Sequence, residues 1–229
     1  MAVKKIFQKV KKEKRKNLLE FEAREILEQY KIPIAKWMLT KKAADAIAFS
    51  KKAGYPVVLK IVSGDIIHKT DVGGVFLNLN SEKEVEQAFN QILKNVKKRA
   101  PRARIDGILV QKMIPEGQQI IVGGKKDPQF GQVLMFGGGG VLVELLEDVA
   151  FRVVPVSKKD AEEMMQETKV YQVLKGFRGK RYDVNSVLNI LLKTSKLLEQ
   201  NPEIAELDLN PVIVLPKNAF VVDARIVVD

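Results

Sequence analysis

The chain has 229 residues, 46% of them hydrophobic and 29% charged, a composition typical of a globular protein rather than a disordered one. The absence of cysteine excludes disulfides and thiolate metal sites and agrees with a reducing compartment. No apolar run approaches the roughly 18 residues of a membrane span, so we expect a cytoplasmic protein with no membrane partner.

The net charge of +11 is concentrated at the N-terminus. Residues 1–16 contain eight basic residues and one acidic residue, whereas the remaining 213 residues contain 31 basic and 27 acidic ones. We therefore expect residues 1–17 to form a separate basic arm, either a short amphipathic helix or a solvated terminus. Such an arm could contact RNA, an anionic surface or an acidic partner.

The first half of the chain alternates helical and strand patterns around one glycine-rich loop. Residues 81–84 begin with serine and end with glutamate, which predicts a capped helix start at Ser81. The expected elements are a helix over Leu18–Tyr30, an extended segment over 31–40, a helix over 41–54, a buried strand over 55–63, a loop over 63–74, a strand over Val75–Leu79 and a helix of about four turns after Ser81.

The second half is richer in strands. The expected strands cover Arg104–Met113, Gln118–Gly123, Gln132–Phe136 and Phe151–Val156, Val141–Leu146 fits strand or helix, helices cover about 158–174 and 184–200, and a hairpin of apolar strands with a turn at Lys217–Asn218 ends the chain. Strands and helices mix irregularly, so we expect an α+β fold rather than a doubly wound sheet. A hinge near 108–116 would separate an N-terminal lobe, 18–108, from a C-terminal lobe, 109–229.

Several common nucleotide and catalytic motifs are absent. No G-x-x-x-x-G-K-[ST] occurs, and the glycines at 137–140 do not form G-x-G-x-x-G. The single histidine excludes a multi-histidine metal cluster, and no serine lies in a G-x-S-x-G turn. If the chain binds nucleotides, it uses another architecture.

The stretch SGDIIHKTDVGGV combines features that suit phosphate chemistry. Lys60 ends the apolar strand before it, where a lysine either reaches the edge of the sheet or meets an anion. Gly64, Gly73 and Gly74 give the loop backbone freedom to direct amides at phosphate. His68, the only histidine, could accept a phosphoryl group at nitrogen. Asp65 and Asp71 could orient its ring, although a surface histidine and a structural lysine are the alternatives.

A second set of polar residues lies near the C-terminus, in ELDLNPV and VVDAR. Glu206, Asp208 and Asn210 alternate along a predicted strand and would share one face. The returning strand would bring Asp223 opposite them. Oxygen ligands of this kind suit Mg²⁺, although the polar face of an amphipathic strand gives the same pattern.

Three stretches together resemble the β-subunits of ADP-forming acetyl-CoA synthetases, an ATP-grasp domain of the nucleoside-diphosphate-forming acyl-CoA synthetases. They are YPVVLKIVSGDIIHKTDVGGV, VQKMIPEGQQIIVGGKKDPQFGQVLMFGGGG and AELDLNPV with VVDAR. The resemblance covers about Leu18 to Asp229. It implies two lobes enclosing a nucleotide cleft, ATP or ADP as substrate, Mg²⁺, and a separate, larger CoA-binding α-subunit in an α2β2 assembly.

The resemblance also implies roles for individual residues. His68 would carry phosphoryl to ADP, and Asp208 would steady its phosphorylated or protonated form. Lys60 would bind nucleotide phosphate, with the glycines of loop 63–74 covering it. The remaining roles are adenine contacts from the backbone of Gln111, Lys112 and Met113, a ribose contact from Glu116, Mg²⁺ ligands Asn210 and Asp223, and Glu206 near the metal or phosphates. A second phosphate-binding cation stays open between Arg152 and Lys112.

Two other functions remain as alternatives. A carboxylate–amine ligase of the same fold would make an acyl phosphate directly and need no phosphohistidine. A basic nucleic-acid-binding module would use the N-terminal arm, but the near-balance of charge after residue 16 and the aromatic content of 7% argue against a nucleic-acid partner.

Overall fold

The computed structural model describes residues 2–66, 68–139 and 148–229. The chain forms two compact units. Unit 1 contains the residues up to Ile34 together with Pro115–Asp229, and unit 2 is Ala35–Ile114. The element expected over Val141–Leu146 lies outside the described residues, as does the last glycine of the run 137–140.

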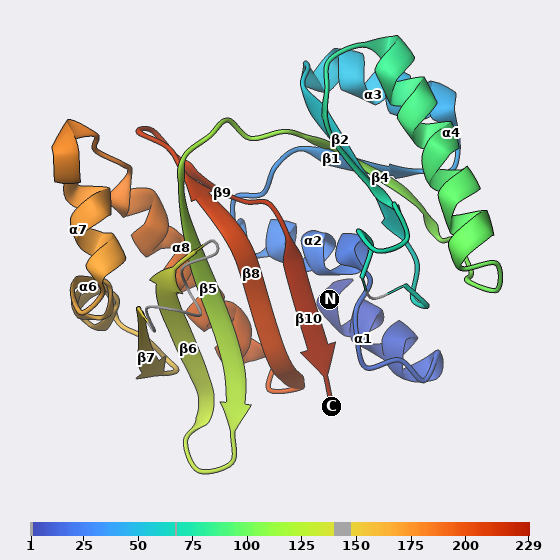
Figure 1. Cartoon of the computed structure of the whole chain (residues 1–229). Helices are drawn as coiled ribbons and strands as arrows, with labels where there is room; N and C mark the ends of the chain where they lie inside the picture. The colour runs from blue at the N-terminus through green and yellow to red at the C-terminus, as the bar shows by residue number, and fades with distance from the viewer. Residues whose placement is uncertain (1, 67, 140–147) are drawn as a thin grey trace. The chain divides into compact units, whose positions relative to one another are not determined.

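Unit 2 is a four-stranded antiparallel sheet with two helices on one face. Its strands are β1 (Trp37–Thr40), β2 (Val57–Val62), β3 (Val75–Leu79) and β4 (Gly107–Lys112), in the order β1-β4-β2-β3. Helices α3 (Ala43–Ala53) and α4 (Glu82–Arg99) lie side by side against this sheet (Figure 1). Ser81 caps α4 by accepting a bond from the amide of Glu84, as the sequence predicts.

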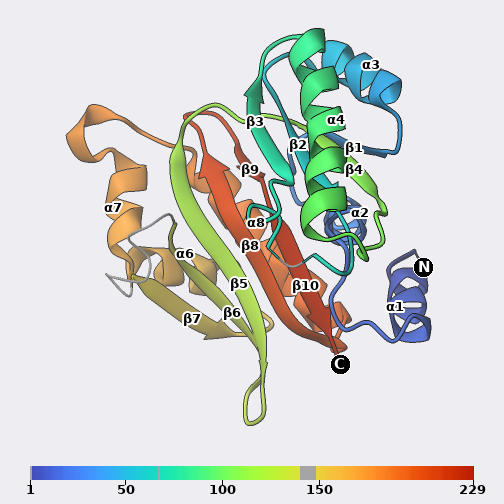
Figure 2. The same ribbon diagram turned by 45° about the vertical axis from the view of Figure 1, so that its right-hand side comes forward.

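Unit 1 is built on a larger antiparallel sheet. Its strands are β5 (Gln118–Asp127), β6 (Gly131–Gly138), β7 (Val149–Val153), β8 (Ile204–Val214), β9 (Ala219–Val221) and β10 (Ala224–Val228), in the order β10-β8-β5-β6-β7, with β9 on β8. Helices α6 (Lys158–Gln166), α7 (Lys169–Lys175) and α8 (Val184–Gln200) pack on one face (Figure 2). Two more helices, α1 (Ala2–Lys12) and α2 (Glu20–Gln29), complete the unit.

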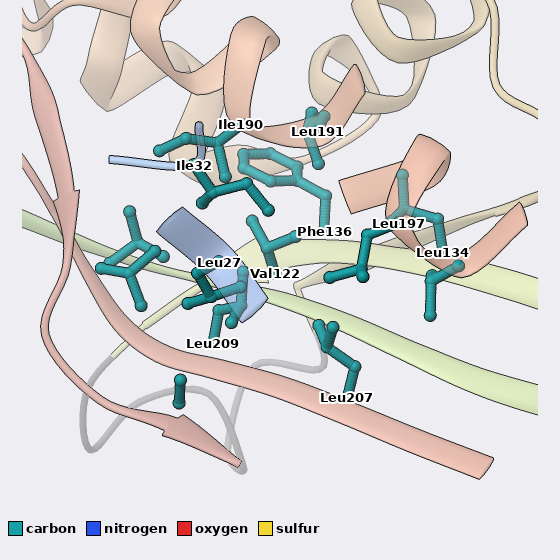
Figure 3. Packing of buried hydrophobic residues seen from close by; sticks show 14 of the residues in the cluster. Leu27, Ile32, Val122, Leu134, Phe136, Ile190, Leu191, Leu197, Leu207 and Leu209 are labelled. Atoms are coloured by element: carbon teal, nitrogen blue, oxygen red, sulfur yellow. The ribbon is translucent and has the colours of Figure 1, made fainter. Parts of the chain in front are cut away.

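The core of unit 1 lies between this sheet and α8. Figure 3 shows Val122, Phe136 and Leu209 of the sheet facing Ile190 and Leu191 of α8. Leu27 of α2 and Ile32 join the same cluster. The segment before unit 2 in the chain is thereby packed into unit 1.

The N-terminal basic segment is part of this core rather than a detached arm. Val3, Ile6, Phe7 and Val10 repeat at helical spacing, and all four are buried in the cluster of unit 1. The expected division placed 1–17 apart and 18–34 with the N-terminal lobe, whereas both segments belong to unit 1. The apolar stripe of α1 explains the difference, because burying it stabilises the helix.

Two further elements differ from expectation. The helix expected over 158–174 is interrupted at Thr168, so α6 and α7 are separate. The last expected strand is also two strands, because the chain turns at Val222–Asp223 between β9 and β10. Among the described residues, no helix has the length and apolar composition that crossing a membrane would require.

Candidate functional site

The face of the larger sheet that is turned away from α8 contains a cavity of about 560 Å³. Strand alternation decides which residues line it: a β-carbon at Gly124 would meet Leu198 of α8, whereas one at Gly123 would meet Met135 in the cavity. The lining includes Ile121, Gly123, Lys125 and Asp127 of β5, Val133 and Met135 of β6, Phe151 of β7, and Glu206 and Asp208 of β8. The cavity is therefore apolar along β6 and β7 and charged along β5 and β8, where Lys125 lies among three carboxylates.

Glu206, Asp208 and Asn210 lie on one face of β8, as their spacing predicts, while Leu207 and Leu209 point into the core. The alternation then changes at a β-bulge. Ile120 pairs with Val212 and Val122 with Leu209, so β8 has one extra residue at Asn210–Pro211. The bulge keeps Asn210 exposed and returns the later apolar residues to the core.

Asp208 is a carboxyl of this site whose pKa is raised. Burial raises the pKa of Asp208, and the charges of Glu206 and Asp223 raise it further. Its Oδ1 is buried without a hydrogen-bond partner among the described residues. A buried carboxylate oxygen of this kind can be stabilised by a cation or by a protonated ligand.

The two expected magnesium ligands meet at the bulge. The amide of Asn210 donates to the carbonyl of Asp223 at 3.2 Å, so the sequence correctly places Asp223 opposite β8. Neither residue lines the cavity, and the described residues contain no cluster of three carboxylate or imidazole ligands. One amide and one carboxylate oxygen fit Mg²⁺, which keeps waters and phosphate oxygens as its other ligands. The unpartnered Oδ1 of Asp208 also favours a cation nearby.

His68 lies in unit 2, exposed on the loop between β2 and β3. Both ends of the loop are anchored. Asp65 accepts a 2.8 Å bond from the amide of Arg104, and Asn95 of α4 donates a 2.9 Å bond to the carbonyl of Gly73. Arg99 of α4 also donates to the carbonyl of Asp71 at 2.8 Å. The anchors hold the two ends of the loop and leave His68 exposed between them.

Two glycines of this loop form backbone hydrogen bonds within it. The amide of Gly73 donates to the carbonyl of Thr70 at 2.9 Å, and the amide of Gly74 donates to the carbonyl of Lys69 at 2.8 Å. These two amides are therefore occupied rather than directed at phosphate. Gly73 has a φ of +64°, and a β-carbon at Gly74 would lie 2.4 Å from Ile61. Gly73 and Gly74 therefore allow the loop to turn back into strand β3. Gly64, at the other end of the loop, is exposed.

The other nucleotide-binding candidates divide between the units. Lys60 is 7% exposed and Gln111 1%, so the lysine does not reach solvent at the sheet edge. The backbone amide of Lys112 donates to the carbonyl of Lys36, and that of Met113 donates to the carbonyl of Pro56. Any adenine contact from the backbone of Lys112 or Met113 would therefore use the carbonyl group of that residue. Glu116 is exposed and belongs to unit 1.

Both candidates for the second phosphate-binding cation bond to other groups in this structure. The Nζ of Lys112 donates to the carbonyls of Gly54 and Tyr55 at 3.1 and 2.6 Å. Arg152 forms a two-pronged ion pair with Glu167, which raises the pKa of Arg152 and lowers that of Glu167. Lys125 instead lines the acidic cavity and pairs across strands with Glu206. The period-two spacing Gly123–Lys125–Asp127 was the signal that the sequence reading missed.

Comparison with known proteins assigns this fold. Residues 9–228 match the ATP-grasp domain family. The chain is 43% identical over 223 residues to the acetate–CoA ligase [ADP-forming] I subunit beta of Pyrococcus furiosus, covering 97% of this chain and 96% of that one. It is also 48% identical over 203 residues to acetate–CoA ligase [ADP-forming] I of Archaeoglobus fulgidus. That match covers 88% of this chain but only 30% of the longer Archaeoglobus protein.

A solved structure is equally similar. The dinucleotide-forming acetyl-coenzyme A synthetase 1 of Ca. Korarchaeum cryptofilum, in complex with coenzyme A and Ca-AMPCP, superposes with a TM-score of 0.94 at 48% identity, covering 99% of both chains. Another structure of that protein contains Mg-AMPPCP and a phosphohistidine segment pointing towards its nucleotide site, with a TM-score of 0.88 at 44% identity over 99% of this chain and 100% of that one. Our chain belongs to the ATP-grasp family, among relatives that are ADP-forming acetate–CoA ligases.

Proposed function

We propose that this chain is the nucleotide-binding β-subunit of an ADP-forming acyl-CoA synthetase, in which His68 passes a phosphoryl group to ADP. The net reaction is acyl-CoA + ADP + phosphate ⇌ acid + CoA + ATP. The observation that carries the proposal is the position of His68, the only histidine of the chain, exposed on a loop with both ends anchored. The Korarchaeum protein, with its phosphohistidine segment, supports the same role.

The transfer step breaks the N–P bond of phosphohistidine and forms a P–O bond to the terminal phosphate of ADP. A proton returns to the imidazole, so phosphohistidine, ADP and one proton give neutral His68 and ATP. Two requirements follow: the imidazole must reach its phosphoryl donor and acceptor, and the charge on the transferring group must be offset. Exposure of His68 meets the first requirement.

The cations and metal ligands of the chain meet the second. Lys60 and Lys125 are the proposed phosphate-binding cations, and Asn210 and Asp223 the proposed ligands of Mg²⁺. Bound Mg²⁺ would offset phosphate charge and hold the phosphates in line. Asp208, whose pKa is raised by burial, would accept a hydrogen bond or a proton from the histidine.

The CoA and acyl sites belong, in this proposal, to a larger CoA-binding α-subunit, and α2β2 is the proposed assembly. The near-complete match to a chain named subunit beta supports a separate partner. The Archaeoglobus protein, of which this chain matches 30%, has room for the same module on one chain. We also propose a cytoplasmic location, because these relatives are metabolic enzymes.

The test is a reconstituted assay with the CoA-binding partner, measuring ATP from acyl-CoA, ADP and phosphate. The intact pair should form ATP, and His68→Gln should abolish it while ADP still binds. Thr70→Ala, an exposed neighbour in the same loop, is the matched control and should retain activity. ATP formation by the His68→Gln pair would overturn the proposal and favour a carboxylate–amine ligase type of chemistry.

A further inference from the structure

Arg24, on α2, is the largest of the fully buried side chains among the residues that the structure describes and is only 1% exposed. Its Nε and Nη2 donate to Oε1 of Glu20, one helical turn earlier, at 3.2 and 3.0 Å. The same Nη2 donates a 2.6 Å bond to the backbone carbonyl of Val222. A paired guanidinium thus connects α2 to a residue 198 positions away in the sequence.

Val222 forms the corner between β9 and β10, directly before Asp223. Its amide donates to the carbonyl of Pro211 at 3.0 Å, inside the bulge of β8. The next carbonyl, that of Asp223, accepts from Asn210 at 3.2 Å. The Oδ1 of Asp223 accepts from the amide of Ala224 at 2.9 Å. The corner is therefore held on the β8 side by backbone bonds and on the α2 side by Arg24.

The burial of this charge calls for an explanation beyond packing. A buried ion pair adds little net stability over apolar residues of the same volume, because both charges lose their hydration. A guanidinium does offer several donors in a fixed plane, so it can bond a carboxylate and a carbonyl together. At this corner it joins Glu20 to the residue that precedes the proposed magnesium ligand.

We propose that Arg24, oriented by Glu20, is a positioning residue that fixes the Val222–Asp223 corner so that Asp223 stays opposite Asn210 for the metal–nucleotide complex. This inference rests on the proposed function. Outer residues of this kind affect metal affinity by orienting a ligand rather than by touching the metal. Neither Arg24 nor Glu20 lines the cavity.

A matched control lies on the same helix. Glu22 is also 1% exposed and is paired, through Arg15 and Lys9, at 2.9 Å each. Glu22 accepts hydrogen bonds from Lys9 and Arg15 of the N-terminal segment and from the amide of Leu19, and none of these donors belongs to the corner. Glu22→Gln therefore disturbs a comparably buried ion pair without touching Val222.

The experiment measures Mn²⁺ binding by electron paramagnetic resonance in the full-length chain with ADP present, together with the melting temperature. Arg24→Gln should weaken Mn²⁺ binding at least tenfold, and Arg24→Lys, which can still reach one acceptor, by less. Glu22→Gln should lower the melting temperature but leave Mn²⁺ affinity within twofold. Asp223→Asn should weaken binding at least as much as Arg24→Gln.

The outcomes separate this inference from the proposed function. If Asp223→Asn weakens Mn²⁺ binding but Arg24→Gln and Arg24→Lys do not, only the positioning role is overturned. Equal losses for Arg24→Gln and Glu22→Gln would also overturn it, since general destabilisation would then explain both. If the unmodified chain binds no Mn²⁺ with ADP, the proposed function and the positioning role both fail. Should Arg24→Gln not fold, Arg24→Lys decides the question.

Discussion

Asp208 and Arg225 are cross-strand partners on β8 and β10, yet the Arg225 guanidinium lies 3.8 Å from Glu206. Arg225 lowers the pKa of Asp208, but burial and the neighbouring carboxylates outweigh it and the pKa is raised overall. This side of the cavity therefore holds a carboxyl group that loses its proton less readily than a carboxyl group in water. Binding of a cation would reverse that preference.

Asp208→Asn should stabilise the empty protein at neutral pH and abolish ATP formation. Because the folded pKa of Asp208 is raised above 3.8, its contribution to stability is present below that pH and is lost as pH rises through the folded value. The advantage of the variant should thus be near zero at pH 3 and reach a plateau at neutral pH. Urea denaturation at a series of pH values measures it.

Asp127, which lines the same cavity two residues after Lys125 on β5, provides a control of opposite sign. Backbone bonds from Phe130 and Gln129 lower the pKa of Asp127 below 3.8, so its contribution is present above that pH and is lost in acid. Asp127→Asn should lower stability at neutral pH. A gain in stability for Asp127→Asn, or a loss for Asp208→Asn, would contradict the electrostatic description of the cavity.

Lys125→Met should weaken ADP binding by roughly 10- to 150-fold, as expected for losing one charge-assisted phosphate contact of about 1.5–3 kcal/mol. Lys126→Met is its matched control, because Lys126 forms an ion pair with Asp229 at 2.6 Å and does not line the cavity. Isothermal titration with ADP and Mg²⁺ distinguishes the two variants. Equal affinities for both would remove Lys125 from the proposed phosphate site.

Gly73→Ala should destabilise the protein more than Gly131→Ala. Both glycines have positive φ, +64° and +74°, so either substitution costs about 1 kcal/mol in backbone strain. Only at Gly73 would the new β-carbon meet a neighbour, Asn95 Nδ2 at 2.6 Å, and disturb the anchor of the histidine loop. Hydrogen exchange of residues 69–74 should rise in Gly73→Ala alone. Unchanged exchange would show that this anchor does not order the loop.

Phe7→Ala should lower the free energy of unfolding by about 3–5 kcal/mol, because Phe7 is 4% exposed and packs in the core of unit 1. Lys4→Ala, on the exposed face of the same helix, should change it by less than about 0.5 kcal/mol. Urea denaturation of both variants measures the difference. Similar values for the two would mean that α1 is a solvated arm after all.

The regular elements were predictable because their signals are local. The buried strand around Lys60 and the serine cap of α4 follow from β-branched composition and from a four-residue capping pattern. The shared face of Glu206, Asp208 and Asn210 follows from strand alternation. In each case the neighbours that decide the structure are close in the sequence.

Features that depend on distant partners were not predictable in the same way. The occupied amine of Lys112 requires the carbonyl of Gly54, and the ion pair of Arg152 requires Glu167 on another element. The bulge at Asn210–Pro211 shows only when β8 is aligned with β5. The role of α1 could have been found from its apolar spacing, but its dense positive charge favoured a detached arm.

Incubation of the purified chain with γ-³²P-ATP and Mg²⁺ tests the central claim most directly, since His68 is its only histidine. We expect acid-labile, base-stable label on the peptide that contains His68, none in His68→Gln, and discharge of the label as ATP when ADP is added. Label that survives the His68→Gln substitution, or an intact chain that takes up none and forms ATP with its partner all the same, would contradict the account.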